Sequence, residues 1–212
     1  MIDISTKRKI KSHEIDMCNG PLFGKILVFT IPVMLSGILQ LLFNAADIIV
    51  VGRYAGSDSL AAVGSTSPLI NLLVNIFVGL SVGTNVVVAR FYGAGKVKDV
   101  DETVHTAILT SMISGVILIV IGITLSKPLL ILMGAPENVL SKSVLYLTIY
   151  FIGMPATMVY NFGSAILRAV GDTRRPLYYL IVAGIINVCL NLIFVVRFDM
   201  GVAGVAVATV IS

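Results

Sequence analysis

Residues 26–52 read ILVFTIPVMLSGILQLLFNAADIIVVG, and this stretch decides the fold of the chain. A helix of this length rises about 40 Å at about 1.5 Å per residue, which exceeds the hydrocarbon core of a bilayer, about 30 Å thick. Asp47 is the one ionisable side chain between Lys25 and Arg53. A charge in hydrocarbon is costly, and acids within membrane spans usually belong to ion or proton pathways. We therefore predict a membrane-spanning helix with a functional carboxylate near its carboxyl end.

The rest of the chain repeats this apolar composition. Its 212 residues are 57% hydrophobic and 12% charged, with a mean hydropathy of +1.00. These values lie far outside the range of soluble domains and predict an integral membrane protein. Apart from Asp47, the windows that lack Lys, Arg, Asp and Glu and are long enough to span are 26–52, 59–89, 103–126, 143–167 and 176–196.

These windows predict an all-α integral membrane bundle with five complete transmembrane helices and the start of a sixth. We expect a cytoplasmic amino-terminal tail at residues 1–22 and a single transmembrane lobe at residues 23–212. The expected helices cover about 23–52, 59–90, 101–126, 138–169, 176–197 and 201–212. The last run is too short to span, so the chain is expected to be a fragment or one lobe of a larger transporter.

The basic residues predict the orientation. If the helices alternate in direction, 11 of the 15 Lys and Arg residues fall on one side, together with the amino terminus. The positive-inside rule places that side in the cytoplasm of a multi-pass protein of the cell membrane. The net charge of +4 follows from this topology and gives no reason to expect a nucleic acid partner. Cys18 and Cys189 have no metal-type spacing, so we expect no disulfide, metal site or cofactor.

Polar side chains form faces on three of the expected helices. On the first helix, Gln40 and Asn44 fall with Asp47 within about 80° of arc at about 100° per residue. On the second, Asn71 and Asn75 share a face, and on the fifth Asn187 and Asn191 lie one turn apart. These amides either hold helices together by hydrogen bonds or line a substrate cavity. Asp47 could also reach water at the helix end, although a carboxylate there opposes the helix dipole.

Two prolines, Pro32 and Pro155, fall inside expected spans, where the loss of a backbone donor can bend a helix.

The spans lack the side chains that an intramembrane enzyme would need. An intramembrane aspartic protease needs two carboxylates, whereas the spans carry only Asp47. A serine nucleophile needs a nearby base, and no span carries a deep histidine. We expect no catalytic residues.

Several motifs resemble, in the same order, those of the multidrug and toxin extrusion (MATE) family of transporters. The resemblance covers roughly residue 20 to the end of the chain. It rests on Gly20-Pro-Leu, Ile31-Pro32, Asp47-Ile-Ile-Val-Val-Gly52, Leu60-Ala-Ala-Val-Gly64, Gly79-Leu-Ser-Val-Gly83, Gly93-Ala-Gly95, Leu167-Arg-Ala-Val-Gly-Asp-Thr-Arg-Arg-Pro176, Asn187-Val-Cys-Leu-Asn191 and the run 201–212.

The resemblance implies one amino-terminal lobe of a twelve-helix transporter with two six-helix lobes, whose carboxy-terminal lobe is missing here. It implies export of organic cations, drugs and other small amphipathic compounds in exchange for H⁺ or Na⁺. By resemblance, the ion-coupling residues are Asp47, Asn187, Asn191 and Thr209. Many relatives carry Asp where this chain has Asn191, and an amide cannot titrate. The coupling ion, H⁺ or Na⁺, therefore stays open.

The expected mechanism is alternating access, in which an external cation neutralises Asp47 and the first helix repacks. Two alternatives remain from the sequence. One is a lipid-linked saccharide flippase of the same superfamily, which would need buried Arg or Lys residues that this lobe lacks. The other is a truncated lobe or structural membrane subunit that transports nothing.

Overall fold

The computed structural model describes residues 22–212, which form helices joined by short connections. Residues 1–21 of the expected tail at 1–22 lie outside the described residues, and Cys18 is among them. The elements in chain order are α1 (Leu22–Val50), the π-helix η1 (Val51–Ala55), α2 (Ser57–Gly93), α3 (Val97–Leu132), α4 (Glu137–Ile152), α5 (Met154–Ala169), α6 (Arg174–Asn191), the π-helix η2 (Leu192–Arg197) and α7 (Gly201–Ile211).

The predicted class, an all-helical membrane bundle, is confirmed. Four helical stretches are long and apolar enough to cross a bilayer: Phe23–Ala55, Ser57–Gly93, Val97–Leu132 and Arg174–Arg197. Helices α4 and α5 together would form a fifth span, which is bent by 51° at the break between them. The break falls at Gly153, and Pro155 is the second residue of α5. The short α7 follows these spans.

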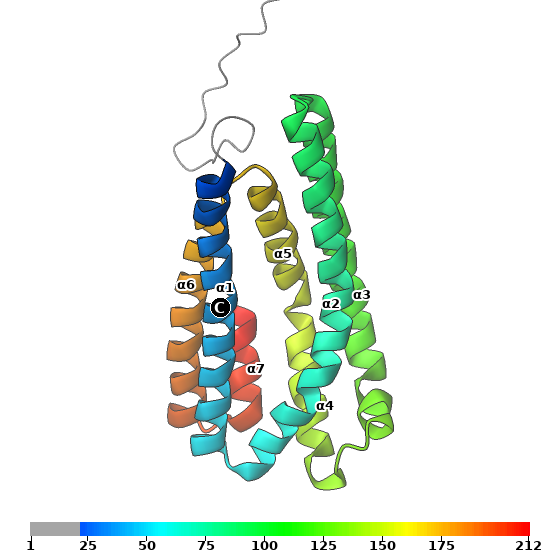
Figure 1. Ribbon diagram of the computed structural model, residues 1–212. Coiled ribbons are helices and arrows are strands. Elements are labelled where there is room, and N and C mark those ends of the chain that lie inside the picture. The colour runs from blue at the N-terminus through cyan, green and yellow to red at the C-terminus, as the bar shows by residue number, and fades with distance from the viewer. Residues whose placement is uncertain (1–21) are drawn as a thin grey trace, which may run out of the picture.

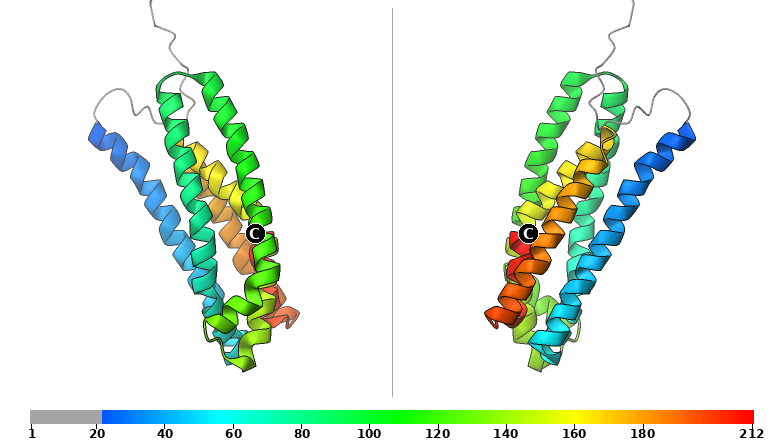
Figure 2. Two further views of the ribbon diagram at one scale, coloured as in Figure 1. Left: turned by 90° about the vertical axis from the view of Figure 1, so that its right-hand side faces the viewer. Right: turned by 90° about the vertical axis from the view of Figure 1, so that its left-hand side faces the viewer.

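The connections gather at two ends of the bundle (Figure 1). We call the end at which α1 begins the amino-terminal end, and the α2–α3 and α5–α6 connections lie there too. At the opposite end lie η1, the α3–α4 connection and η2 with the start of α7. Two turned views show that α1 leans away from α2 toward the amino-terminal end and approaches it at η1 (Figure 2). Among the described helices, α6 is the main neighbour of α1.

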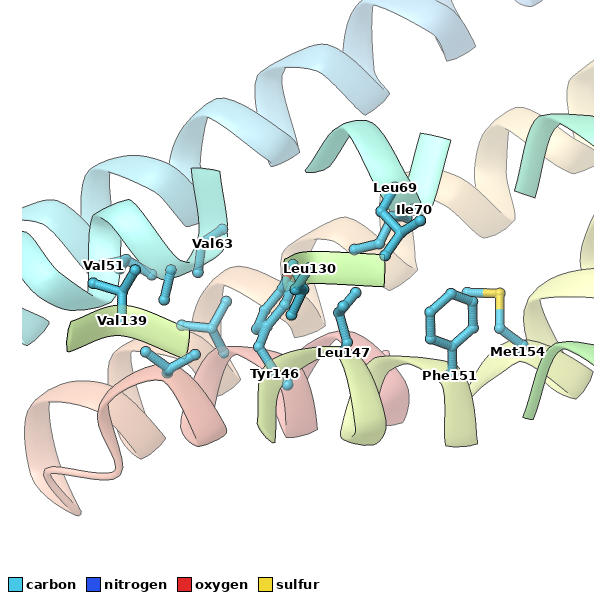
Figure 3. Packing of buried hydrophobic residues seen from close by; sticks show 14 of the residues in the cluster. Val51, Val63, Leu69, Ile70, Leu130, Val139, Tyr146, Leu147, Phe151 and Met154 are labelled. Atoms are coloured by element: carbon cyan, nitrogen blue, oxygen red, sulfur yellow. The ribbon is translucent and has the colours of Figure 1, made fainter. Parts of the chain in front are cut away.

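The apolar core lies in the half of the bundle that holds η1 and η2, and Figure 3 shows its packing. Val51 of η1, Leu130 of α3 and Leu147 of α4 are fully buried there, at 0% exposure each, with Val63 of α2 at 5%. Helix α7 closes this core because it packs on α4, α6 and both π-helices. The core therefore fixes one end of the bundle, whereas many apolar side chains of α1 and α2 remain exposed, as expected for a bilayer-facing surface.

Small residues set the closest helix contacts. A Cβ added at Gly122 of α3 would overlap the ring of Phe151 on α4, and one added at Gly115 would overlap the backbone of Pro155 on α5. Helices in membranes associate mainly through such close packing, because lipid is as apolar as their side chains. The bend between α4 and α5 is thus held against a pair of glycines on α3.

Polar contacts add links between helices. The hydroxyls of Ser65 on α2 and Ser143 on α4 lie 3.1 Å apart. The amide of Asn85 on α2 donates to the carbonyl of Ala165 on α5 across 2.7 Å. In the half of the bundle away from the apolar core, this amide supplies a directional contact between α2 and α5.

Asn85→Ala is expected to lower the stability of the protein by about 1 kcal/mol, because interhelical hydrogen bonds in membranes contribute about that much. The loss should appear as a Tm lower by a few degrees in lipid nanodiscs. Asn75→Ala is the matched control, since Asn75 is exposed on the same helix and makes no hydrogen bond within the described residues. Equal Tm values for the two variants would contradict a stabilising role for the Asn85 contact.

Candidate functional site

Asp47 begins the last turn of α1, four residues before the start of η1, and is half-buried. The Nδ2 amide of Asn191 donates a hydrogen bond to its Oδ1 atom across 2.5 Å. Asn191 is the last residue of α6 and is fully buried, at 0% exposure. The carboxylate is therefore held at the point where the two helices α1 and α6 both change to π-helix.

A chain of hydrogen bonds extends from this pair into α7. Asn191 Nδ2 also donates to Asn187 Oδ1, 3.0 Å away and one turn earlier on α6. Asn187 Nδ2 lies 3.4 Å from the hydroxyls of both Thr209 on α7 and Ser212. The four predicted ion-coupling residues thus come together in one network across α1, α6 and α7.

The network contains more hydrogen-bond acceptor oxygens than donor hydrogens to pair with them. The Thr209 hydroxyl donates its hydrogen to the Val205 carbonyl, 2.9 Å away, so its lone pairs face the amide of Asn187. Asn191 Oδ1 is buried and has no hydrogen-bond partner within the described residues. A buried acceptor without a donor is costly, and a proton or a cation at the site would supply the missing interaction.

Two tyrosines of α4 complete the surroundings. Tyr146 and Tyr150 stack with ring centroids 6.0 Å apart, and both hydroxyl groups lie within electrostatic range of the Asp47 carboxylate. Sequence reasoning missed these residues and Ser212. The available signals were the spacing of four residues between the tyrosines and of three between Thr209 and Ser212, which put each pair on one helix face.

Helix packing holds the carboxylate beside its amide partner. Phe43 lies one turn before Asp47 on α1, and its ring covers Gly184, which lies one turn before Asn187 and Val188 on α6. A Cβ added at Gly184 would overlap the ring. The two helices therefore approach closely one turn before Asp47, next to the network.

The other predicted site residues lie elsewhere. Gln40 and Asn44 on α1 and Asn71 and Asn75 on α2 are exposed, and no hydrogen bond of the described residues involves their side chains. They are not part of the Asp47 network, and their role in a substrate cavity stays a prediction. Pro32 is buried within the uninterrupted helix α1, and its carbonyl accepts a hydrogen bond from the Ser36 hydroxyl across 2.8 Å.

The MatE family model matches residues 32–193 of the chain. The chain is 35% identical over 189 residues to the probable multidrug resistance protein YoeA of Bacillus subtilis, covering 87% of this chain and 41% of that protein. It is 29% identical over 203 residues to an FAD transporter of Shewanella oneidensis, covering 92% of this chain and 44% of that protein.

A solved structure shows the same arrangement of helices. It is described as the outward-facing conformation of a multidrug resistance MATE family transporter of the MOP superfamily. The chain superposes on it with a TM-score of 0.87 at 29% identity, covering 96% of this chain and 45% of that one. The chain thus spans less than half the length of these relatives. Because the family model covers most of the chain and includes both Asp47 and Asn191, this multi-pass membrane protein belongs to the MATE family of transporters.

Proposed function

We propose that residues 23–212 form the amino-terminal lobe of a cation-coupled antiporter that exports small amphipathic compounds, organic cations among them, by alternating access. The observation that carries the proposal is the hydrogen bond from Asn191 to the carboxylate of Asp47, within a network that joins three helices. An acid inside a membrane span that is held by neutral amides, with no cationic partner among the described residues, is suited to gain and lose a cation.

The proposed switch is neutralisation of Asp47. While it is ionised, the carboxylate attracts the donor hydrogens of Asn191. When it is protonated or bound to Na⁺, that attraction weakens and the free acceptor of Asn191 gains a partner. Helix α1 is placed to respond, because α6 is its main helical neighbour and Asp47 lies at their contact. A ligand shifts a conformational equilibrium only through such a difference in interaction between the two states.

Both proposed coupling ions fit the chemistry of these residues. Na⁺ prefers oxygen ligands, and the network offers carboxylate, amide and hydroxyl oxygens. A proton needs one titratable group, and Asp47 is the only acidic residue of the network. Because Asn191 cannot titrate, coupling to H⁺ would carry at most one proton through this network in each cycle.

The proposed substrates follow from the uncharged polar side chains that α1 and α2 expose. Gln40, Asn44, Asn71 and Asn75 offer hydrogen bonds but no charge, which suits loose recognition of amphipathic molecules. The relative YoeA is named as a probable multidrug resistance protein, which agrees with amphipathic substrates. The Shewanella relative is named as a transporter of FAD, a flavin dinucleotide. A phosphate-bearing substrate would need basic side chains, and these four positions supply none.

We place the amino-terminal end of the bundle in the cytoplasm and Asp47 toward the outside. The distribution of Lys and Arg supports this orientation through the positive-inside rule. An external cation would then reach Asp47 from the end of the bundle that holds η1 and η2.

The experiment that tests the function is efflux of ethidium, a fluorescent organic cation, by the protein expressed from its native gene in proteoliposomes. We expect efflux to accelerate when an inwardly directed gradient of either Na⁺ or H⁺ is imposed, and the effective ion identifies the coupling. Liposomes with equal ion concentrations on both sides are the control. Efflux that ignores both gradients would exclude cation-coupled antiport, and absence of ethidium transport under any gradient would exclude this class of substrate.

A further inference from the structure

A pocket of about 430 Å³ lies between the carboxyl half of α2 and the amino half of α3. Its wall on α2 consists of Thr84, Val87 and Phe91. These residues lie toward the amino-terminal end of the bundle, whereas the Asp47 network lies toward η1 and η2 (Figure 1). The volume falls within the usual range for small-molecule sites. Neither the Asp47 network nor the four exposed amides of α1 and α2 contribute a residue to it.

The hydroxyl groups in the wall of this pocket act as acceptors. Thr84, Thr103, Thr106 and Thr110 each donate their hydroxyl hydrogen to the carbonyl four residues earlier in the same helix. Their oxygen lone pairs remain available to a donor, while their methyl groups supply apolar surface. The threonine side chains therefore offer the pocket no hydrogen-bond donor.

The remaining polar lining is anionic, and it meets an aromatic ring. Asp99 and Glu102 lie one turn apart at the start of α3, beside Phe91 of α2. Within the described part of the chain, the Glu102 carboxylate forms no ion pair. Acceptor oxygens, carboxylates and an aromatic face together favour a cation that carries N–H donors.

Lys96 in the α2–α3 connection already makes this kind of contact. Its Nζ atom lies 5.9 Å from the centroid of the Phe91 ring and 3.6 Å from Asp99 Oδ2. The side chain remains largely exposed, at 61%, so it is held loosely and an incoming cation can displace it. A primary ammonium on the protein itself thus occupies the contacts that a ligand with the same head group would use.

We propose that this pocket binds an amphipathic primary ammonium, whose head group contacts Asp99 and Glu102 while its apolar body lies along Phe91 and Val87. Lys96 competes for the same contacts as a tethered ammonium. The head group can belong to a free amphipathic amine or to phosphatidylethanolamine, since both present a primary ammonium at the membrane surface. The binding site is separate from Asp47, so it stands whether or not the proposed coupling mechanism does.

The test measures binding of monodansylcadaverine, a fluorescent primary amine with an apolar body, to the protein from its native gene in phosphatidylcholine nanodiscs. Glu102→Gln is expected to weaken binding on the order of fivefold, because it removes an exposed charge from the head-group contact. Asp101→Asn is the matched control, since Asp101 lies one position away, is exposed and does not line the pocket. The N-acetylated probe, which is neutral, should bind weakly to every variant.

Lys96→Gln should have the opposite effect and tighten binding on the order of fivefold, because it removes the tethered competitor. Lys98→Gln makes the same charge change two residues away and should leave the affinity unchanged. Asp47→Asn should also leave it unchanged, which separates failure of this proposal from failure of the transport mechanism.

The same measurement in nanodiscs that contain phosphatidylethanolamine distinguishes the two sources of the head group. Weaker binding of monodansylcadaverine in these nanodiscs would show that the lipid competes for the pocket and would assign the site to its head group, whereas unchanged binding would assign it to a free amine. Equal binding of the acetylated probe, or equal effects of Glu102→Gln and Asp101→Asn, would overturn the proposal.

Discussion

Asp47→Asn is expected to abolish cation-coupled ethidium efflux, reducing the rate to that of liposomes without the protein. Asparagine has nearly the same shape as aspartate, and its Oδ1 atom can still accept the hydrogen bond from Asn191. It carries no charge and cannot be neutralised by H⁺ or Na⁺. The substitution therefore removes the proposed switch while keeping the contact between α1 and α6.

The measurement is ethidium efflux under imposed Na⁺ and H⁺ gradients, together with the Tm of the purified variant. We expect the Tm to stay close to that of the parent protein, since no buried volume changes. Asp58→Asn is the matched control, because Asp58 is an exposed acid at the start of α2 that pairs with Lys142 at 3.6 Å. That variant should transport normally. Gradient-driven efflux at the parent rate by Asp47→Asn would exclude Asp47 as the coupling residue.

Gly184→Ala is expected to separate α1 from α6 and to cost about 1–3 kcal/mol of stability, the range for overpacked helix contacts. The new methyl group would overlap the ring of Phe43, so either the ring leaves its rotamer or α1 moves away. Movement of α1 would carry Asp47 away from Asn191. We therefore expect a lower Tm together with a loss of coupled efflux.

A second substitution tests whether the Phe43 ring is the cause. Phe43→Leu removes the part of the ring that the new methyl would meet, so the double variant should recover part of the stability and efflux lost by Gly184→Ala. Such non-additivity is expected only for residues in contact. Gly163→Ala on α5 is the control, because a Cβ there meets no atom within 4 Å. If the double variant lost as much as the two single changes together, steric contact between Phe43 and Gly184 would be excluded as the explanation.

The membrane class and the polar helix faces could be predicted because both follow from local patterns. The apolar run around Asp47 requires a bilayer, and the spacing of Asn187 and Asn191 puts two amides on one side of α6. Helical periodicity does not say which helix faces which. The placement of Tyr146 and Tyr150 within electrostatic range of Asp47, and of Phe43 over Gly184, depends on how distant segments pack.

The break in the fourth expected span shows both what a local pattern predicts and what it misses. Pro155 indicated a bend within residues 138–169, and the helix is interrupted there, at Gly153, in the turn before the proline, where the missing backbone donor weakens the helix. Gly153 has room for no side chain, because an added Cβ would press against Val210 of α7. Pro155 thus locates the break, whereas the contact of Gly153 with a helix that follows more than forty residues later is one that a local sequence pattern cannot reveal.

The π-helical turn η1 begins at Val51, one turn after Asp47, and η2 begins at Leu192, directly after its partner Asn191. A π-helix spaces its hydrogen bonds at five residues instead of four, so side chains beyond it are rotated relative to a continuing α-helix. Within these two turns Val51 and Val195 are buried in the apolar core, whereas the preceding turns present a carboxylate and an amide. Each of the two helices therefore contacts the Asp47 network just before its π-helical turn and the apolar core within that turn, so substitutions among the network residues need not change how the π-helical turns pack.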